Sequence, residues 1–111
     1  MTIDDLTVGQ LKQLTGLLQA GKLAENPYEI GAAYFIRTVT FHYTGRLVRV
    51  TEHELVLEDA AWIADNGRFS DALAKGTLNE VEPYPVGHVI IGRGSLVDAV
   101  FWPHALPRVQ K

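Results

Sequence analysis

The segment HVIIGRGSLVDAV, residues 88–100, constrains the fold more than any other part of this chain. Five of its residues are β-branched, which favours a strand, yet Gly92 and Gly94 flank an arginine at its centre. A glycine inside a strand weakens it and usually marks a bend, a bulge or a close approach by another group. We therefore expect strand structure from Val89 to Trp102, interrupted at these two glycines and limited beyond by Pro103.

Composition places the chain among small globular domains. Its 111 residues fit one domain, and 47% of them are hydrophobic, which argues against disorder. The absence of cysteine excludes disulfides, thiolate zinc sites and cysteine nucleophiles. The net charge of -3 gives no basic footprint for nucleic acid, so we expect no DNA partner. The chain lacks an apolar run of the ~20 residues that a membrane helix needs. The acidic start MTIDDL lacks the order of a signal peptide. We therefore expect a cytoplasmic protein without a membrane partner.

An amphipathic helix is predicted near the N-terminus, at about residues 8–20. Thr7 and Gln10 have the spacing of a capping box, in which each side chain satisfies a free backbone N–H of the first turn. Apolar residues then recur at helical spacing, at Val8, Leu11, Leu14, Leu17 and Leu18. Gly21 follows at the place where a glycine commonly ends a helix.

Strand patterns begin at Tyr34 and continue to Ile63. Residues 34–51 are rich in Val, Ile, Thr, Tyr and Phe, and the apolar members alternate as in a half-buried strand at Val39, Phe41 and Tyr43. Gly45 interrupts the alternation and shifts its phase, which indicates a sharp bend or bulge within one long strand. The tetrapeptide Thr51-Glu-His-Glu54 is then a polar turn, and residues 54–63 form the next predicted strand.

The segment from 64 to 87 differs from the strands around it and is interpreted as an insertion. Asp65-Asn-Gly67 is a turn signal. Residues 68–75 predict a short helix ended by Gly76, and residues 79–87 predict a loop. The predicted fold is therefore mainly β: an N-terminal helix, then a small barrel at about 34–63 and 88–107, in a single domain covering residues 1–111. Closure into a barrel would remove exposed strand edges.

Two motifs in these strands resemble those of the Sm-like family, which includes the bacterial Hfq proteins. In the first, Gly45-Arg-Leu-Val-Arg-Val50 and a polar turn precede Leu55-Val-Leu-Glu-Asp59, which is similar to the family's apolar strand, turn and L-x-L-x-D. In the second, Val89-Ile-Ile-Gly-Arg-Gly94 followed by Leu96-Val97 is similar to the family's apolar run, I-R-G and second apolar run. A helix before the barrel also belongs to the family pattern.

The resemblance implies a strongly bent five-stranded barrel and a ring of six or seven subunits. The ring closes when the fourth strand of one barrel pairs with the fifth strand of the next. The resemblance also places Arg93 and Gly94 in a loop at the central pore, beside Glu52 and His53 of the polar turn. The family uses these loops to hold RNA bases. This chain departs from the pattern, because two glutamates and a histidine replace the usual Asp and Asn of the turn, Gly92 replaces an isoleucine, and the insertion is longer.

Other chemistry-bearing residues admit a structural and a functional interpretation. Trp62 and Phe69 either cover one end of the barrel or, with Arg68, recognise a partner, since Trp and Arg are common interface anchors. The carboxylates Glu58, Asp59, Asp65 and Asp71 show no paired-acid or triad signature, so we expect no enzyme activity. His53 beside two glutamates could bind a metal or act as a pH switch, although a solvated turn is the favoured interpretation. The histidines at 42, 88 and 104 have no metal-ligand spacing, and we expect neither a metal nor another cofactor.

The last strand suggests how the chain assembles. Residues 99–102 are apolar, and an unpaired strand there would expose backbone groups beside two aromatic rings. Pairing with residues 88–91 of a neighbour would satisfy them and give a cyclic homo-oligomer, with a hexamer as the expected size. The predicted interface residues are Val89, Ile91, Val100, Phe101 and Trp102.

Three functions follow from these observations. The first is a non-catalytic, ring-forming Sm-like module whose partner is another copy of itself. The second is an Sm-like binder of RNA or of a nucleotide through Arg93 and Gly94, which the acidic turn disfavours because glutamates repel phosphate. The third, with least support, is a small hydrolase.

Overall fold

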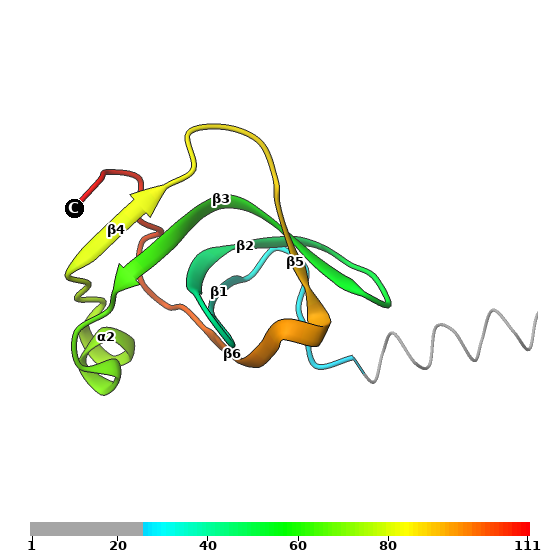
Figure 1. Cartoon of the computed structure of the whole chain (residues 1–111), viewed down its shortest axis with the longest axis horizontal. Helices are drawn as coiled ribbons and strands as arrows, with labels where there is room; N and C mark the ends of the chain where they lie inside the picture. Colours follow the sequence, from blue (N-terminus) through cyan, green and yellow to red (C-terminus); the bar gives the residue numbers. More distant parts are fainter. Residues whose placement is uncertain (1–25) are drawn as a thin grey trace, which may run out of the picture.

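The computed structural model describes residues 26–111, which form a mainly β structure with one α-helix (Figure 1). Six strands make one antiparallel sheet in the order β4-β3-β2-β1-β6, and β5 also pairs with β3. The sheet curls strongly but is not closed. Its strands are β1 (Ala33–Thr38), β2 (His42–Val50), β3 (Glu54–Asp65), β4 (Glu80–Pro83), β5 (Val89–Gly92) and β6 (Leu96–Phe101). The helix predicted at residues 8–20 lies outside the described residues.

The prediction of one continuous strand across residues 34–51 is wrong, because the chain turns back at residues 39–41. Thr38 makes this turn: its hydroxyl donates to the carbonyl oxygen of Phe41 at 2.6 Å and accepts from the Phe41 N–H at 2.9 Å. A threonine hydroxyl that bonds to nearby backbone groups stabilises such turns. Val39 and Phe41 are therefore exposed, at 75% and 48%, and their alternation with polar residues does not reflect burial.

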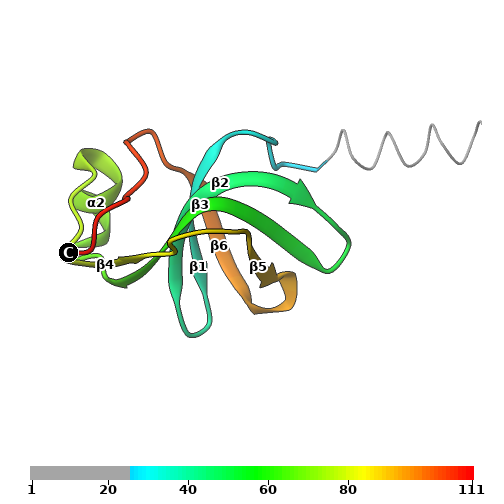
Figure 2. The ribbon, with the colours of Figure 1, turned by 90° about the horizontal axis from the view of Figure 1, so that it is seen from above.

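The second hairpin uses the same device and confirms the predicted polar turn. The N–H of Thr51 donates to the carbonyl oxygen of Glu54 at 2.9 Å, and the Thr51 hydroxyl accepts from the Glu54 N–H at 3.0 Å. β3 begins at Glu54, as predicted, and extends to Asp65, two residues past the predicted end. Figure 2 shows this hairpin projecting from the end of the sheet away from the α-helix.

Gly45 marks the point where β2 and β3 bend together. Thr44 pairs with Ala61 and Arg46 pairs with Glu58, so two residues of β3, Asp59 and Ala60, form a bulge opposite the single residue Gly45. Asp59 has a positive φ of 48°, a left-handed conformation that aspartate tolerates better than most residues. The bend predicted at Gly45 is therefore present, although in a shorter strand than expected.

The bulge divides β3 into two halves with different neighbours. Residues 54–57 pair with β5, and residues 61–65 pair with β4. Figure 1 shows β4 and β5 along the same edge of β3, joined by a long loop. β4 corrects the prediction of a loop across residues 79–87. Its short run EVEP carries only one buried residue, Val81, which is too little alternation to indicate a strand from sequence.

The core has two parts because both faces of β1 are covered. One face of β1 contributes to a cluster with β2, β3 and β5, whose buried members are Tyr34, Ile36, Leu47, Leu55, Leu57, Ala60 and Ile91. The other face is covered by α2 (Phe69–Lys75) and the chain after β6, with Phe35, Ala61, Ile63, Ala72, Leu78, Val81 and Trp102 buried there. A strand covered on both faces shows no clear alternation, which explains the run of consecutive apolar residues at Tyr34–Ile36.

The insertion packs tightly against the C-terminal segment (residues 103–111). α2 confirms the predicted short helix and ends, as predicted, at Gly76, which has a left-handed φ of 73°. His104 Nε2 lies 2.7 Å from the carbonyl oxygen of Leu73. A Cβ on Gly76 would lie 2.7 Å from the His104 ring, so only glycine allows this contact.

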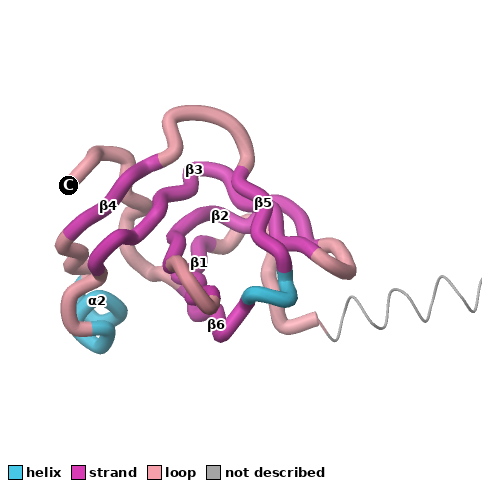
Figure 3. Tube along the Cα trace, in the orientation of Figure 1, coloured by secondary structure: helices cyan, strands magenta, loops and turns pink. Residues whose placement is uncertain are grey.

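The interruption at Gly92–Gly94 separates two strands. β5 ends at Gly92, Arg93–Ser95 form a single 3-10 turn, and β6 begins at Leu96 (Figure 3). β5 pairs with β3, whereas β6 pairs with β1 at the other edge of the sheet. Gly92 therefore precedes, and Gly94 lies within, the turn by which the chain passes from one edge of the sheet to the other.

β6 is fixed to β1 by an ion pair. The Arg37 guanidinium donates to both carboxylate oxygens of Asp98 and lies over the Phe69 ring, with 4.1 Å from Cζ to the ring centroid. The hydrogen bond from Arg37 holds the pKa of Asp98 below its usual value, and nearby His42 adds to this effect. The pair joins β1, β6 and the first residue of α2.

We expect Gly45→Val to lower the free energy of unfolding by roughly 2 kcal/mol or more, because overpacking at a close approach is costly. A Cβ at this position would lie 3.0 Å from both Cβ and Cδ1 of Leu57. Gly45→Ala should cost less, since it adds one methyl group. Thermal and urea unfolding measure both variants, and a melting temperature unchanged in Gly45→Val would contradict the close packing of β2 on β3.

We expect Asp98→Asn to lower the free energy of unfolding by about 1 kcal/mol or less at neutral pH, because the side chains of Arg37 and Asp98 are both partly exposed. Since the folded pKa of Asp98 is depressed, its contribution is present above the unfolded pKa and disappears as the pH falls through the folded pKa. Urea unfolding between neutral pH and pH ~3 should show the two proteins converging. Glu29→Gln, which removes an exposed carboxylate, should show no such convergence, and a pH-independent difference for Asp98→Asn would refute the ion-pair explanation.

Candidate functional site

The structure brings Arg93 and the polar turn together, as the predicted loop cluster requires. The Arg93 N–H donates to the carbonyl oxygen of His53 at 2.8 Å, and its guanidinium donates to the carbonyl oxygen of Thr51 at 2.7 Å. The guanidinium carbon also lies 5.9 Å from the centroid of the Tyr28 ring. Arg93 therefore connects the 3-10 turn to the tip of the β2–β3 hairpin.

The side chains around Arg93 that face solvent are mainly acidic. Glu52 and His53 are 88% and 84% exposed, with His53 Nε2 4.0 Å from Glu52 Oε2, and Gly94 is exposed beside them. A ligand of Arg93 would have to compete with the Thr51 carbonyl and lie near Glu52. The nucleotide-binding role of this loop stays a prediction.

The predicted recognition residues Trp62, Arg68 and Phe69 do not form one surface. Trp62 contacts Phe41, with ring centroids 5.7 Å apart. Phe69 packs on the opposite face of the sheet against Phe35, with centroids 5.5 Å apart, and beneath Arg37. Arg68 is exposed on the loop before α2. Trp62 and Phe69 thus lie on opposite faces of the sheet, because Trp62 alternates along β3 with Ala61 and Ile63, which are buried on the Phe35 side.

The predicted interface residues divide into buried and exposed groups. Ile91 and Trp102 are only 5% and 4% exposed, and Val89 is partly buried, so all three belong to the core of their own chain. Val100 and Phe101 are 37% and 52% exposed on β6. Ile90 on β5 and Val97 on β6 are each 61% exposed and were not among the predicted interface residues, because alternation within such short strands does not reveal which face is covered.

Two strands of the sheet have a free edge. The Trp102 N–H donates to the carbonyl oxygen of Ala33 at 2.8 Å. Because alternate residues of an antiparallel strand direct their N–H groups to the same side, Ala99 and Phe101 direct theirs away from β1. Similarly, the bond from Arg93 to His53 means that Ile90 and Gly92 direct theirs away from β3. Within the described residues, β4, β5 and β6 each have one strand neighbour, but Lys111 covers the other side of β4 by exchanging two backbone hydrogen bonds with Val81.

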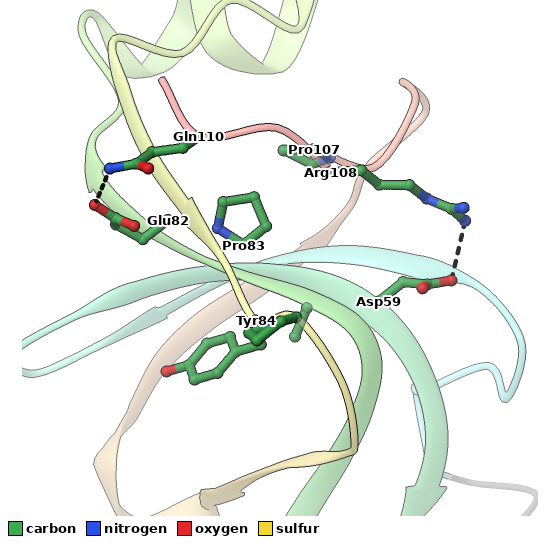
Figure 4. Close-up of a pocket in the computed structure, with 9 residues that line it drawn as sticks. Asp59, Glu82, Pro83, Tyr84, Pro107, Arg108 and Gln110 are labelled. Atoms are coloured by element: carbon green, nitrogen blue, oxygen red, sulfur yellow. Dashed lines mark hydrogen bonds and ion pairs between the residues drawn. The ribbon is translucent and has the colours of Figure 1, made fainter.

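A pocket of about 400 Å³ lies where β3 bends, between the end of β4 and the C-terminal segment (Figure 4). We call it the Asp59 pocket. Its lining consists of Asp59, Ala60, Glu82, Pro83, Tyr84, Pro85, Pro107, Arg108 and Gln110. The Arg108 guanidinium donates to Asp59 Oδ2 at 3.1 Å, and the Gln110 amide donates to Glu82 Oε1 at 2.9 Å. Burial and, secondly, Tyr84 raise the pKa of Tyr43.

Sequence reasoning missed this pocket because its walls come from three separate segments. Asp59 was considered as the last residue of the first Sm-like motif and as one of several carboxylates without a catalytic signature, and nothing in the sequence indicates its positive φ or its contact with Arg108. The only available signal was the cluster of prolines at 83, 85 and 107, which predicts loops and not their convergence.

Residues 26–111 contain no group of three or more His, Cys, Asp or Glu side chains that could hold a metal ion. Across the same residues, the helices are too short or too polar to cross a membrane.

Comparison of the chain with models of known protein families, with curated proteins and with solved structures finds no match. The Sm-like resemblance therefore depends on the two sequence motifs alone.

We expect Arg93→Ala to loosen the β2–β3 turn, at a cost of about 1 kcal/mol for the lost charged hydrogen bond. The amide protons of Thr51 and Glu54 should exchange faster, which hydrogen exchange followed by NMR measures. Arg49→Ala is the matched control, because Arg49 is exposed near the end of the same hairpin. Equal exchange rates in Arg93→Ala and the parent protein would show that Arg93 does not hold the turn.

Proposed function

We propose that this chain is a non-catalytic Sm-like subunit that assembles with copies of itself into a ring, joined by β5 of one subunit and β6 of the next. The observation that carries the proposal is the pair of free strand edges. An open edge that exposes backbone groups and apolar side chains favours pairing with another chain. Two different edges on one subunit favour head-to-tail contacts, which close into a ring when the rotation between subunits allows it.

The exposed side chains on these two strands support the same assignment. Ile90 on β5 and Val97, Val100 and Phe101 on β6 are apolar and accessible. Their apolar surface would be removed from water by strand pairing, which stabilises an interface. Phe101 is already oriented by stacking on Tyr34, with ring centroids 4.9 Å apart, so little side-chain freedom would be lost on binding.

The order of the elements supports the Sm-like part of the proposal. The sheet has a bent pair of strands at Gly45 and Asp59, a connection through an insertion, and a single 3-10 turn before the last strand. The bend and the 3-10 turn lie within the two segments that carry the Sm-like motifs, and the insertion lies between these segments. By that resemblance, β5 corresponds to the fourth barrel strand and β6 to the fifth, and the expected ring has six subunits.

Light scattering after size exclusion tests the ring. We expect a mass of about six times the 12.3 kDa chain for the parent protein. Val97→Lys should release smaller species, because a lysine at a strand edge opposes edge-to-edge pairing. Val109→Lys makes the same change on the C-terminal segment, where Val109 is 79% exposed, and should leave the mass unaltered.

Circular dichroism of each variant verifies that the subunit remains folded. A parent protein that is monomeric at micromolar concentration would overturn the proposal. The proposal would also be overturned if the Val97→Lys and Ile90→Lys variants are both folded and both keep the mass of the full ring.

A further inference from the structure

The Asp59 pocket carries an inference that is independent of ring assembly. Its two carboxylates lie on opposite walls, and both receive their partner from the C-terminal segment. Asp59 is paired with Arg108, and Glu82 accepts from Gln110 (Figure 4). The same segment is anchored beyond the pocket, where Val81 and Lys111 exchange two backbone hydrogen bonds of 3.0 Å.

The contact between Arg108 and Asp59 is exposed and therefore weak. Their side chains are 68% and 42% exposed, and ion pairs of this kind are worth about 1 kcal/mol or less. The anchoring bonds of Lys111 do not involve the Arg108 side chain, so the guanidinium can leave Asp59 while the end of the segment stays in place. When it leaves, the residues lining the pocket present two carboxylates and no cation.

The chemistry of the lining suits an arginine side chain, the group that already pairs with Asp59 at its wall. Pro83, Tyr84, Pro85 and Pro107 provide apolar walls, and the carboxylate of Asp59 lies at the end of the cavity beside Arg108. An arginine presents an aliphatic stem and a planar guanidinium that binds carboxylates in a defined geometry. The volume of the pocket, about 400 Å³, is within the range of about 300–1,000 Å³ for ligand sites.

We propose that the Asp59 pocket binds an arginine side chain carried on an extended segment of a partner protein, and that Arg108 pairs with Asp59 in its absence. The extended form of the partner follows from the form of the segment that carries Arg108, which has neither helix nor strand. Asp59 accepts the incoming guanidinium, and Glu82 provides a second acidic group on the opposite wall.

The probe for this site is a synthetic peptide LPRVQ, the sequence of residues 106–110, with blocked ends. The control peptide replaces its arginine by citrulline, which has nearly the same shape and no charge. Binding is followed by 1H–15N NMR on the full chain, with the amides of Asp59, Ala60, Glu82 and Tyr84 as reporters. The arginine peptide should give saturable shifts at these amides, and the citrulline peptide should not.

Three variants separate a binding site from a structural contact. Asp59→Asn should lower the affinity for the arginine peptide about tenfold, because a charge-assisted hydrogen bond is lost while asparagine tolerates the left-handed backbone. Glu80→Gln removes an exposed carboxylate from the same region, outside the pocket lining, and should have no effect. Arg108→Ala should tighten binding up to about fivefold, because the competing internal guanidinium is removed.

The proposal is overturned if the arginine and citrulline peptides bind equally, if neither binds even to Arg108→Ala, or if Asp59→Asn leaves the affinity unchanged. A pocket that takes anions would instead respond to acetate and lose that response in Arg108→Ala, and this outcome would also overturn it. Unfolding of each variant by urea verifies that a lost signal does not reflect a lost fold.

Discussion

The close approach of β2 and β3 at Gly45 is the constraint on which the rest of this structure depends. Opposite Gly45, β3 carries two residues in place of one, and Asp59 adopts a left-handed backbone to accommodate the extra residue. A bulge of this kind bends a strand and increases its twist. The bend divides β3 into a half that pairs with β5 and a half that pairs with β4. The curl of the sheet, the separation of its two free edges and the position of the Asp59 pocket all follow from this point.

Two surfaces with different chemistry result from this geometry. The free edges of β5 and β6 expose apolar side chains and backbone groups, which suit pairing with another strand. The Asp59 pocket is acidic and lined by residues of the bend, the end of β4 and the C-terminal segment. Because the two surfaces use different residues, assembly and the binding of an arginine-bearing segment can occur in the same subunit.

Several side chains hold the structure where the resemblance suggested ligand contacts. Arg93 was expected at a pore loop, and its guanidinium donates to the carbonyl oxygen of Thr51 within its own chain. Ile91 and Trp102 were expected between subunits and are buried within one. In a small domain the few large or multidentate side chains are needed to complete the core and the turns, which limits those left over for partners.

The sequence by itself determined those features that depend on neighbouring residues. The polar turn at residues 51–54, the helix that ends at Gly76, the strand beginning at Glu54 and the break around Arg93 were all predicted, because turn residues and β-branched runs act locally. The turn at Thr38 was missed, since the alternation of Val39 and Phe41 imitates a strand.

Only the tertiary structure decided which of these segments meet. The pairing of β5 with one end of β3, the edges left free, the burial of Ile91 and the contact between Asp59 and Arg108 join residues far apart in the chain. Such contacts depend on how the bent sheet brings distant segments together. Local patterns in a single sequence do not indicate which distant segments will be in contact.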